Sequence, residues 1–302
     1  MAVRTKTLPP DRGLTARMML TVFLLGALYL FFSWILLQAN AGIQTMVIIL
    51  GLMLAAQYYF SDRLALLSMG AREVTPQQAP ELHDMVARLA AIADLPKPKV
   101  AISPARFPNA FAVGRNQKTA TVAVTRGLLD QLEPHELEAV LAHEITHIKN
   151  RDVAIITFAS FFATLAGYLT QHLFYFGLWG GFSSRDDRNS ANWGAIVYLV
   201  SLLVYVISFF LIRALSRYRE FAADRGAAIL TGAPSHLASA LLKISGRMKV
   251  APQRDLREAE AMNAFFIAPA LSGEGLAELF STHPSLERRL AHLRRLEEEM
   301  RR

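Results

Sequence analysis

The sequence predicts a mainly α-helical integral membrane protein, with four transmembrane helices and a cytoplasmic α+β domain. Three observations lead to this fold class. Of the 302 residues, 53% are hydrophobic and 19% are charged, whereas soluble domains carry roughly 25% charged residues. The apolar residues gather in long runs that contain no charge. Basic residues flank these runs and two more polar segments separate them, which together indicate membrane spans and a domain outside the membrane.

The composition also restricts the possible chemistry. The chain has no cysteine, so disulfides, cysteine-ligated metals and thiol nucleophiles are excluded, and any metal site has to use histidine and carboxylate ligands. The net charge of +7 fits binding to nucleic acid or to an anionic membrane surface. The positions of the basic residues decide between these two classes of partner.

The first apolar run predicts two transmembrane helices. Between Met18 and Ser61 the sequence contains no Asp, Glu, Lys, Arg or His, and one span needs about 20 apolar residues. The stretch Gln38–Gly42 predicts a tight hairpin between spans at 18–38 and 43–60. A signal peptide is the competing interpretation of the first span. It is disfavoured because a second span follows directly, with no small-residue cleavage site before a mature domain.

Two further runs predict the third and fourth spans. One extends from Val153 to Ser184 and is interrupted only by His172, and the other extends from Asn189 to Ile212 after a short polar loop. A very hydrophobic soluble core is the alternative, but globular helices rarely lack charge over such lengths. The predicted divisions of the chain are 1–61 (tail and first two spans), 62–152, 153–212 (last two spans) and 213–302.

The basic residues orient the spans. Four of them precede the first span, and others lie at the ends of the remaining spans that adjoin the polar segments, whereas the hairpin at 38–42 has none. The positive-inside rule then places both termini and both polar segments in the cytoplasm. This orientation explains the excess positive charge, so we expect a lipid bilayer and no nucleic acid as a partner.

The first polar segment predicts both helix and strand. Thr75–Pro76 predicts the start of a helix that Pro96 ends, because proline fits the first turn of a helix and interrupts its interior. Residues 99–102 predict a short strand. Residues 107–114 and 121–125, joined by a turn, predict a β-hairpin.

The rest of the extramembrane domain is predicted to be helical. Pro134 marks the start of a helix that reaches at least Asn150. The second polar segment predicts helices at 213–230, 234–248 and 284–300, while 249–281 has no clear periodicity. We expect the two polar segments, each too short for a large core of its own, to pack together as one domain.

The helix that begins at Pro134 carries the motif His143-Glu144-Ile145-Thr146-His147. Residues four apart share one face of a helix, so both imidazoles can bind one metal ion. Zinc lowers the pKa of a bound water towards neutrality, and Glu144 can accept that water's proton and pass it to the leaving amine. Two ordinary surface histidines are the alternative, which the helical context disfavours.

A catalytic zinc needs a third protein ligand, and Glu220 is the best candidate. The extended motif of the metzincins is absent, because positions 150 and 153 are Asn and Val. His147 precedes the third predicted span and Glu220 follows the fourth, so both are expected about 9–12 Å from the membrane edge on adjacent helices. Asp224 lies one turn after Glu220 and can accept a hydrogen bond from a ligand imidazole. A solvated helix face that pairs with neighbouring arginines is the alternative.

These motifs resemble the HtpX-type membrane zinc metallopeptidases, which are related to the Ste24-type CaaX prenyl proteases. The matching elements are Pro108–Ala112, the His143–His147 motif, Arg219–Asp224 and Thr282–Pro284. They occur in the order found in the family, together with the four-span layout, so the resemblance covers nearly the whole chain.

The resemblance implies a gluzincin-like zinc protease domain with one zinc ion per chain. Its ligands would be His143, His147 and Glu220, with Glu144 as the catalytic base. It also implies a multi-pass protein of a bacterial or archaeal plasma (inner) membrane. The enzyme would cleave membrane proteins or unfolded polypeptides from the cytoplasmic side, as part of membrane quality control.

Weaker predictions concern the surroundings of the motif. The residues Asn109, Ala110, Phe111 and Ala112 are predicted to form an edge strand that pairs with an extended substrate, with an ordinary hairpin as the alternative. His283 is a candidate for stabilising the oxyanion, with a capping or packing role as the alternative. The group Asn150–Asp152 is predicted to fix the end of the third span.

Three functional hypotheses follow. The leading one is an integral-membrane zinc endopeptidase. The second is a CaaX-type prenyl-protein protease, which has more spans in this family. The third is a non-enzymatic, zinc-stabilised membrane scaffold, which the presence of Glu144 disfavours because that residue binds no metal. The sequence predicts neither the physiological substrates nor the oligomeric state.

Overall fold

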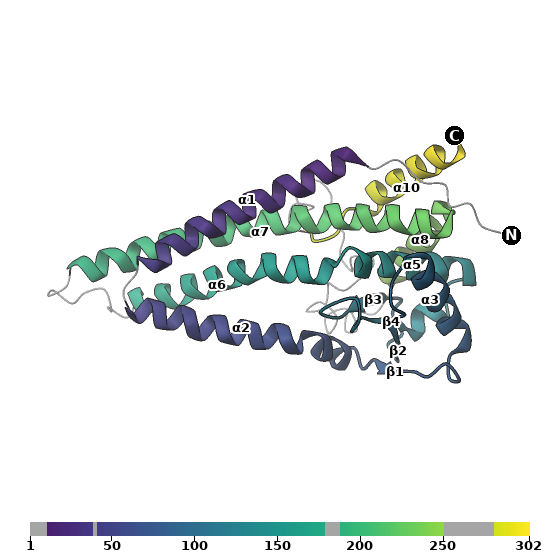
Figure 1. Cartoon of the computed structure of the whole chain (residues 1–302), viewed down its shortest axis with the longest axis horizontal. Helices are drawn as coiled ribbons and strands as arrows, with labels where there is room; N and C mark the ends of the chain where they lie inside the picture. Colours follow the sequence, from purple (N-terminus) through teal and green to yellow (C-terminus); the bar gives the residue numbers. More distant parts are fainter. Residues whose placement is uncertain (1–10, 39–40, 179–187, 251–280) are drawn as a thin grey trace. The chain divides into compact units, whose positions relative to one another are not determined.

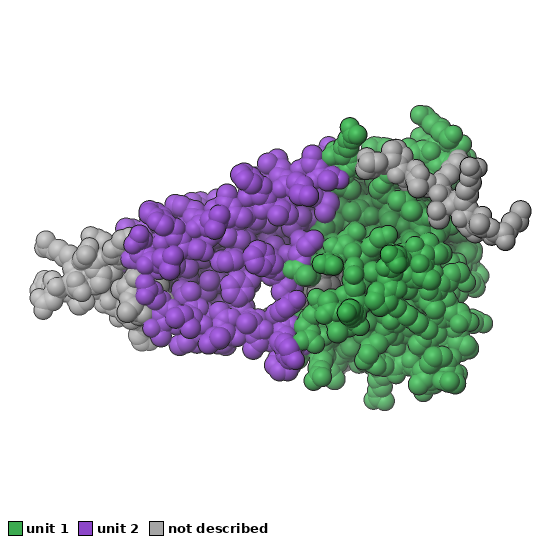
Figure 2. Space-filling model, viewed as in Figure 1, with its two compact units in different colours: residues 1–14, 61–154, 216–302 green, residues 15–60, 155–215 purple. Residues whose placement is uncertain are grey.

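The computed structural model describes residues 11–38, 41–178, 188–250 and 281–302. The chain divides into two compact units (Figure 2). Unit 1 comprises residues 1–14, 61–154 and 216–302, and unit 2 comprises residues 15–60 and 155–215. Much of the stretch without clear periodicity, 251–280, lies outside the described residues.

The described part of unit 2 is built from four long helices, which Figure 1 shows: α1 (Arg12–Leu37), α2 (Ala41–Ser68), α6 (Asp152–Leu178) and α7 (Arg188–Thr231). Among the described residues, three helical stretches are long and apolar enough to cross a membrane: Arg12–Leu37, Ala154–Tyr175 and Gly194–Thr231. In α2, a shorter apolar stretch covers Val47–Ala56. Three of the four predicted spans therefore coincide with helices of membrane-spanning length.

The outer surface of unit 2 is apolar, as a bilayer requires. Phe23 and Leu30 are 69% and 75% exposed, although both are large hydrophobic side chains that water would penalise. Inside, the hydroxyl of Tyr29 donates a hydrogen bond to the carbonyl of Ala159 at 2.6 Å. This bond connects α1 with α6 and satisfies a polar group that lipid cannot solvate.

The helix α7 is longer than predicted. The sequence indicates a span that ends at Ile212 and a separate helix at 213–230, whereas the structure has one continuous helix, Arg188–Thr231. The physical reason is that no proline interrupts this stretch, so helical hydrogen bonding continues beyond the apolar run. Between α5 and α6 the chain does break, at Asn150 and Arg151.

Unit 1 contains a four-stranded mixed sheet in the order β1-β2-β4-β3. The strands are β1 (Arg72–Glu73), β2 (Lys99–Ser103), β3 (Ala110–Val113) and β4 (Thr121–Thr125). The predicted hairpin is confirmed, because β3 pairs with β4 in antiparallel fashion. β2 runs parallel to β4, and the short β1 was not predicted. β3 is an edge strand of this sheet.

Among its described residues, unit 1 also contains the end of α7 and five further helices: α3 (Pro80–Ile92), α4 (Arg126–Leu129), α5 (Pro134–Lys149), α8 (Pro234–Val250) and α10 (Leu286–Arg301). The predicted starts of α5 and α8 are confirmed. The prediction for Thr75–Pro76 was wrong, since α3 begins at Pro80 and the amide of Thr75 bonds to the side chain of Gln78 in a turn. The last helix begins at Leu286, because Ser285 caps it.

The helix α5 lies at the centre of unit 1. Its side chains from Ala139 to Thr146 are all buried. Glu136 closes a capping box at its start and binds Ser239 and Lys243 of α8 at 2.6 and 2.7 Å. On another side, Gly226 of α7 lies so close to Thr146 that any Cβ at position 226 would overlap its side chain. These contacts hold the motif of α5 against α7.

Candidate active site

Three side chains from two helices converge in the interior of unit 1. His143 and His147 lie one turn apart on α5, and Glu220 lies on α7. One ligand atom from each of the three lies within 4.8 Å of the others, so together they could hold a metal ion. The predicted third ligand is therefore next to the two histidines in space, although 73 positions separate it from His147 in number.

The distances between the ligand atoms fit a tetrahedral zinc site. The two Nε2 atoms are 3.1 Å apart. The Nε2 atoms of His143 and His147 are 3.6 and 3.4 Å from the nearer carboxylate oxygens of Glu220. Ligands that bind zinc tetrahedrally at about 2.0–2.1 Å lie roughly 3.3 Å from one another. The donor set of two imidazoles and one carboxylate therefore suits zinc in both chemistry and spacing.

His143 is oriented by a buried ion pair. Its Nδ1 lies 3.0 Å from Oδ1 of Asp224, so Nε2 is left to face the other ligands. Arg289 of α10 binds the same carboxylate, with Nε 2.9 Å from Oδ2. Burial lowers the pKa of His143, but the hydrogen bonds to Asp224 and Glu220 outweigh burial and raise it overall. Asp224 thus occupies the position predicted for it beside a ligand imidazole.

His147 has a matching arrangement that the sequence did not predict. Its Nδ1 lies 2.6 Å from Oδ2 of Asp152, whose Oδ1 lies 2.9 Å from Nε of Arg219. Although burial lowers the pKa of His147, the carboxylates of Asp152 and Glu220 raise it to about 10. Asp152 was predicted only to fix the end of a span. It also orients a candidate metal ligand, so that prediction was too narrow.

Glu144 is buried beside the ligands without being one of them. Its pKa is raised, because burial outweighs the attraction of the two histidines and a hydrogen bond from the backbone of Ala112. A carboxylate in this position can exchange a proton with a molecule that lies between it and the ligand group. Its backbone partner belongs to β3, so the strand and the acid–base candidate adjoin each other.

His283 also reaches the ligand group. Its Nδ1 lies 3.2 Å from Oε2 of Glu220, and both side chains are buried. The hydroxyl of Ser281 fixes the backbone here, since it donates to the carbonyl of His283 and accepts from its amide. Burial raises the pKa of Glu220, but His283 and the two ligand histidines lower it well below its usual range. Glu220 is thus held as a carboxylate.

The register of β3 identifies which backbone groups face outwards. The carbonyl of Asn109 accepts a hydrogen bond from the amide of Thr125, and its amide donates to the hydroxyl of Thr125. Successive residues of an antiparallel pair alternate between facing the partner and facing away. The backbone groups of Asn109, Phe111 and Val113 therefore face β4, while those of Ala110 and Ala112 face the free edge.

Arg289 is the largest feature that sequence reasoning missed. It is 2% exposed and lies 3.4 Å from Glu220 as well as binding Asp224. A signal was present, because Arg289 falls on the apolar face of α10 with Leu286, Leu293 and Leu296. A charged residue at such an inward position indicates a buried partner.

Comparisons with known proteins find similar sequences along nearly the whole chain. Residues 76–297 match Peptidase family M48. The chain is 63% identical to "Protease HtpX homolog" of Moorella thermoacetica over 98% of both chains. It is 53% identical to "Protease HtpX homolog 2" of Methanosarcina mazei over 96% of this chain and 97% of that protein. The crystal structure of S. mikatae Ste24p has a similar fold, with a TM-score of 0.57 at 18% identity, over 93% of this chain and 66% of that one.

Proposed function

The chain belongs to Peptidase family M48, and from this premise we propose that it is a membrane zinc endopeptidase that cuts unfolded cytoplasmic segments of membrane proteins. The observation that carries the proposal is the group formed by His143, His147 and Glu220, whose spacing suits zinc. Glu144, buried beside this group, is the acid–base residue that peptide hydrolysis requires.

The chain's own residues account for the proton transfers of the reaction. When bound by the three ligands, zinc supplies Lewis acidity towards the scissile carbonyl and towards a water molecule. Glu144 accepts one proton as the water oxygen bonds to the carbonyl carbon. It then delivers this proton to the nitrogen as the C–N bond breaks. We propose that His283, which lies next to Glu220, stabilises the negative charge that develops on the carbonyl oxygen.

The substrate is proposed to bind as an extended strand along β3. Both backbone groups of Ala110 and the carbonyl of Ala112 can pair with such a strand, since the amide of Ala112 already donates to Glu144. The neighbouring Asn109 and Phe111 hold β3 to the sheet. Ala112 also contacts Glu144, so pairing there brings a substrate carbonyl close to the acid–base residue. Folded or helical segments cannot pair in this way, which favours unstructured loops and tails.

The place of action follows from the basic residues. They support four spans with both termini and the active site on the cytoplasmic side, in a bacterial or archaeal plasma membrane. The bilayer would hold membrane-protein substrates near the enzyme, consistent with a role in removing misfolded or damaged membrane proteins.

Because the chain has no cysteine, Gln38→Cys and Ser235→Cys each provide a single labelling site, and the two sites are predicted to lie on opposite sides of the membrane. In intact cells an impermeant maleimide should label only the Gln38→Cys variant, and labelling of Ser235→Cys would overturn the orientation.

A prenyl-protein endopeptidase is the second candidate, and its support is the fold likeness to Ste24p. That likeness extends over only 66% of the Ste24p chain, whereas the HtpX homologues match this chain over nearly their full length. A farnesylated CaaX peptide and an unlipidated unfolded polypeptide distinguish the two. Preferential cleavage of the lipidated peptide would favour the second candidate.

The central experiment is the variant Glu144→Gln, because it removes the proton acceptor and no metal ligand. Purified in detergent, it should retain one zinc per chain while casein cleavage falls by at least about 10²–10⁴-fold. Glu138→Gln is the matched control, since Glu138 lies on the same helix and pairs with Arg88 at the surface. Cleavage by Glu144→Gln at the rate of the unmodified enzyme would contradict the mechanism, and an unmodified protein that holds zinc but cuts no casein would point to the scaffold hypothesis.

A further inference from the structure

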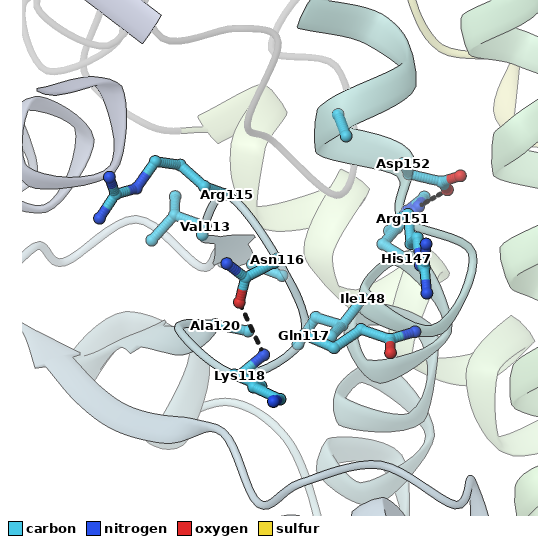
Figure 3. A pocket seen from close by; sticks show the side chains of 13 residues that line it. Val113, Arg115, Asn116, Gln117, Lys118, Ala120, His147, Ile148, Arg151 and Asp152 are labelled. Carbon is cyan, nitrogen blue, oxygen red and sulfur yellow. Dashed lines mark hydrogen bonds and ion pairs between the residues drawn. The ribbon is translucent and has the colours of Figure 1, made fainter. Parts of the chain in front are cut away.

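A cavity of about 370 Å³ adjoins the candidate ligand His147. Figure 3 shows its two walls: the β3–β4 turn, with Arg115 and Lys118, lies on one side, and the end of α5, with Ile148 and Arg151, lies on the other. The turn is tied to α5 by a hydrogen bond from the side chain of Gln117 to the carbonyl of Lys149, at 3.1 Å. The cavity is therefore a formed feature of unit 1 that begins at the proposed reaction centre.

The charge that this cavity presents is positive. Lys118 and Arg151 are exposed and Arg115 is half-buried. The one carboxylate among the lining residues, Asp152, has a 1% exposed side chain and is engaged by His147 and Arg219. Arg115 lies 3.6 Å from Asp62, which offsets one cation and leaves two in excess. An anionic group is the ligand that this lining favours.

The backbone at Arg151 supports a use for its side chain. Among the described residues, only Arg151 and Asp94 combine a side chain with a positive φ, at 55° and 58°. Each directly follows the last cap residue of a helix, a position where glycine is strongly preferred. Asp tolerates the left-handed region better than most residues, whereas Arg gains nothing there from its backbone. The strained position is occupied by a side chain that lines the cavity.

We propose that this cavity is a substrate subsite that accepts an acidic side chain on the N-terminal side of the scissile bond. The inference rests on the proposed function and deepens it. A substrate strand antiparallel to β3 continues in its N-terminal direction past Ala112 towards Gly114, and both residues line the cavity. Two residues of a strand cover about 7 Å, so the acidic residue lies about two or three positions before the cut.

An anionic lipid headgroup could also satisfy the cations, but the position of the cavity favours a peptide. Its lining includes His147 and the end of β3, which are the proposed ligand and the proposed substrate strand. A group bound in the cavity would therefore lie along the path of the substrate peptide. The two sources are separated by the experiment, because only a peptide subsite changes the choice of cleavage site.

The experiment uses the full-length zinc enzyme in neutral detergent and a set of unstructured peptides. They differ only at the second and third positions before a mapped cleavage site, which carry Asp, Asn or Lys. We expect kcat/KM to be about tenfold higher for Asp than for Lys, with the difference mostly in KM and reduced by salt.

Two variants and one control test whether Arg151 is responsible. Arg151→Gly should lower the preference for Asp by about two- to fivefold, while the thermal midpoint does not fall, because glycine suits the backbone there. Arg151→Glu should shift the preference towards Lys. Asp94→Gly, which makes the same backbone change at the matching position of α3, should leave the preference and the activity as they are.

The outcomes separate the two proposals. If the unmodified enzyme cuts no peptide at all, the proposed function fails. If it cuts the three peptides equally, or if Arg151→Glu leaves the preference unchanged, only the subsite is overturned. Weaker binding of Arg151→Glu to phosphatidylglycerol vesicles, without a change in peptide preference, would assign the cavity to lipid and also overturn the subsite.

Discussion

Each of the two histidines of the metal centre is oriented by a carboxylate that in turn binds an arginine, but the residues that do this differ between the two histidines. On the His143 side, the imidazole binds Asp224, which binds Arg289. On the His147 side, the imidazole binds Asp152, which binds Arg219. Each side is thus a series of imidazole, carboxylate and guanidinium, and each leaves the Nε2 atom facing the centre. Such partners fix the tautomer and orientation of a metal-binding histidine.

The two sides differ in burial and in distance along the chain. Arg289 and Asp224 are 2% and 0% exposed at their side chains, and they belong to α10 and α7. Asp152 follows His147 after five positions, and Arg219 adjoins Glu220. The His147 side chain is 14% exposed and lines the cavity, whereas that of His143 is 1% exposed. Both sides depend on tertiary packing, but only the buried side uses a residue from a further helix, Arg289 of α10. The residues of the open side all lie within five positions of a candidate ligand, and that side adjoins the cavity.

Glu220→Ala should have the largest effect, because it removes the ligand that both sides share. Only two histidines remain, so we expect zinc binding to weaken by more than about 10³-fold and activity to be lost. Zinc content at nanomolar free metal measures this. Glu299→Ala, which removes a surface partner of Arg225, serves as the control and should keep its zinc. Stoichiometric zinc in Glu220→Ala would reject the third ligand.

The two arginines provide the next test. Arg289→Met leaves the buried carboxylates of Asp224 and Glu220 without their cation, and such a change costs about 3–5 kcal/mol. Arg219→Met removes a cation from Asp152 alone, which His147 still binds, so about 1–3 kcal/mol is expected. Thermal unfolding in detergent measures the difference, with the exposed Arg88→Met as a control below about 1 kcal/mol. Equal losses at Arg289 and Arg219 would show that burial does not distinguish the two sides.

The same difference explains what the sequence could predict. The motif on α5, the hairpin and the long apolar runs are local patterns, and each corresponds to an observed element. Glu220 could be proposed because it follows the fourth apolar run, and the end of that run fixes how far Glu220 lies from the membrane edge. Arg289 could not be assigned, because nothing local connects α10 with α5, and its contact with Asp224 depends on the packing of three helices. Asp152 lies close enough to His147 in sequence for its contact with that histidine to be predicted. Its position at the start of an apolar run suggested instead that it anchors the end of the third span.

Asp224→Asn and Asp152→Asn compare the carboxylates themselves. Each removes the charge that orients one ligand imidazole, so zinc affinity should fall by about 10–100-fold in either variant. We expect the larger loss for Asp224→Asn, because Arg289 then keeps its buried positive charge next to His143 with Glu220, itself a candidate metal ligand, as the remaining carboxylate within reach. Competition with a chelator of known affinity measures both. A larger loss for Asp152→Asn would reverse the proposed ranking of the two sides.

The pH dependence of zinc binding gives the smallest and most specific test, because the variant Asp152→Asn changes it on the His147 side. The pKa of His147 is raised to about 10 by Asp152 and Glu220 against the opposing effect of burial. Below that pH the imidazole holds a proton, and zinc binds only the neutral form. The affinity for zinc should therefore rise with pH between 6 and 8.5, by about tenfold per pH unit for each proton displaced.

Calorimetry in two buffers of different ionisation enthalpy counts the protons that zinc binding releases. Asp152→Asn removes one cause of the raised pKa, so it should release fewer protons at pH 8 than the unmodified enzyme. An unchanged proton count in that variant would mean that Asp152 orients the ring of His147 without setting its charge.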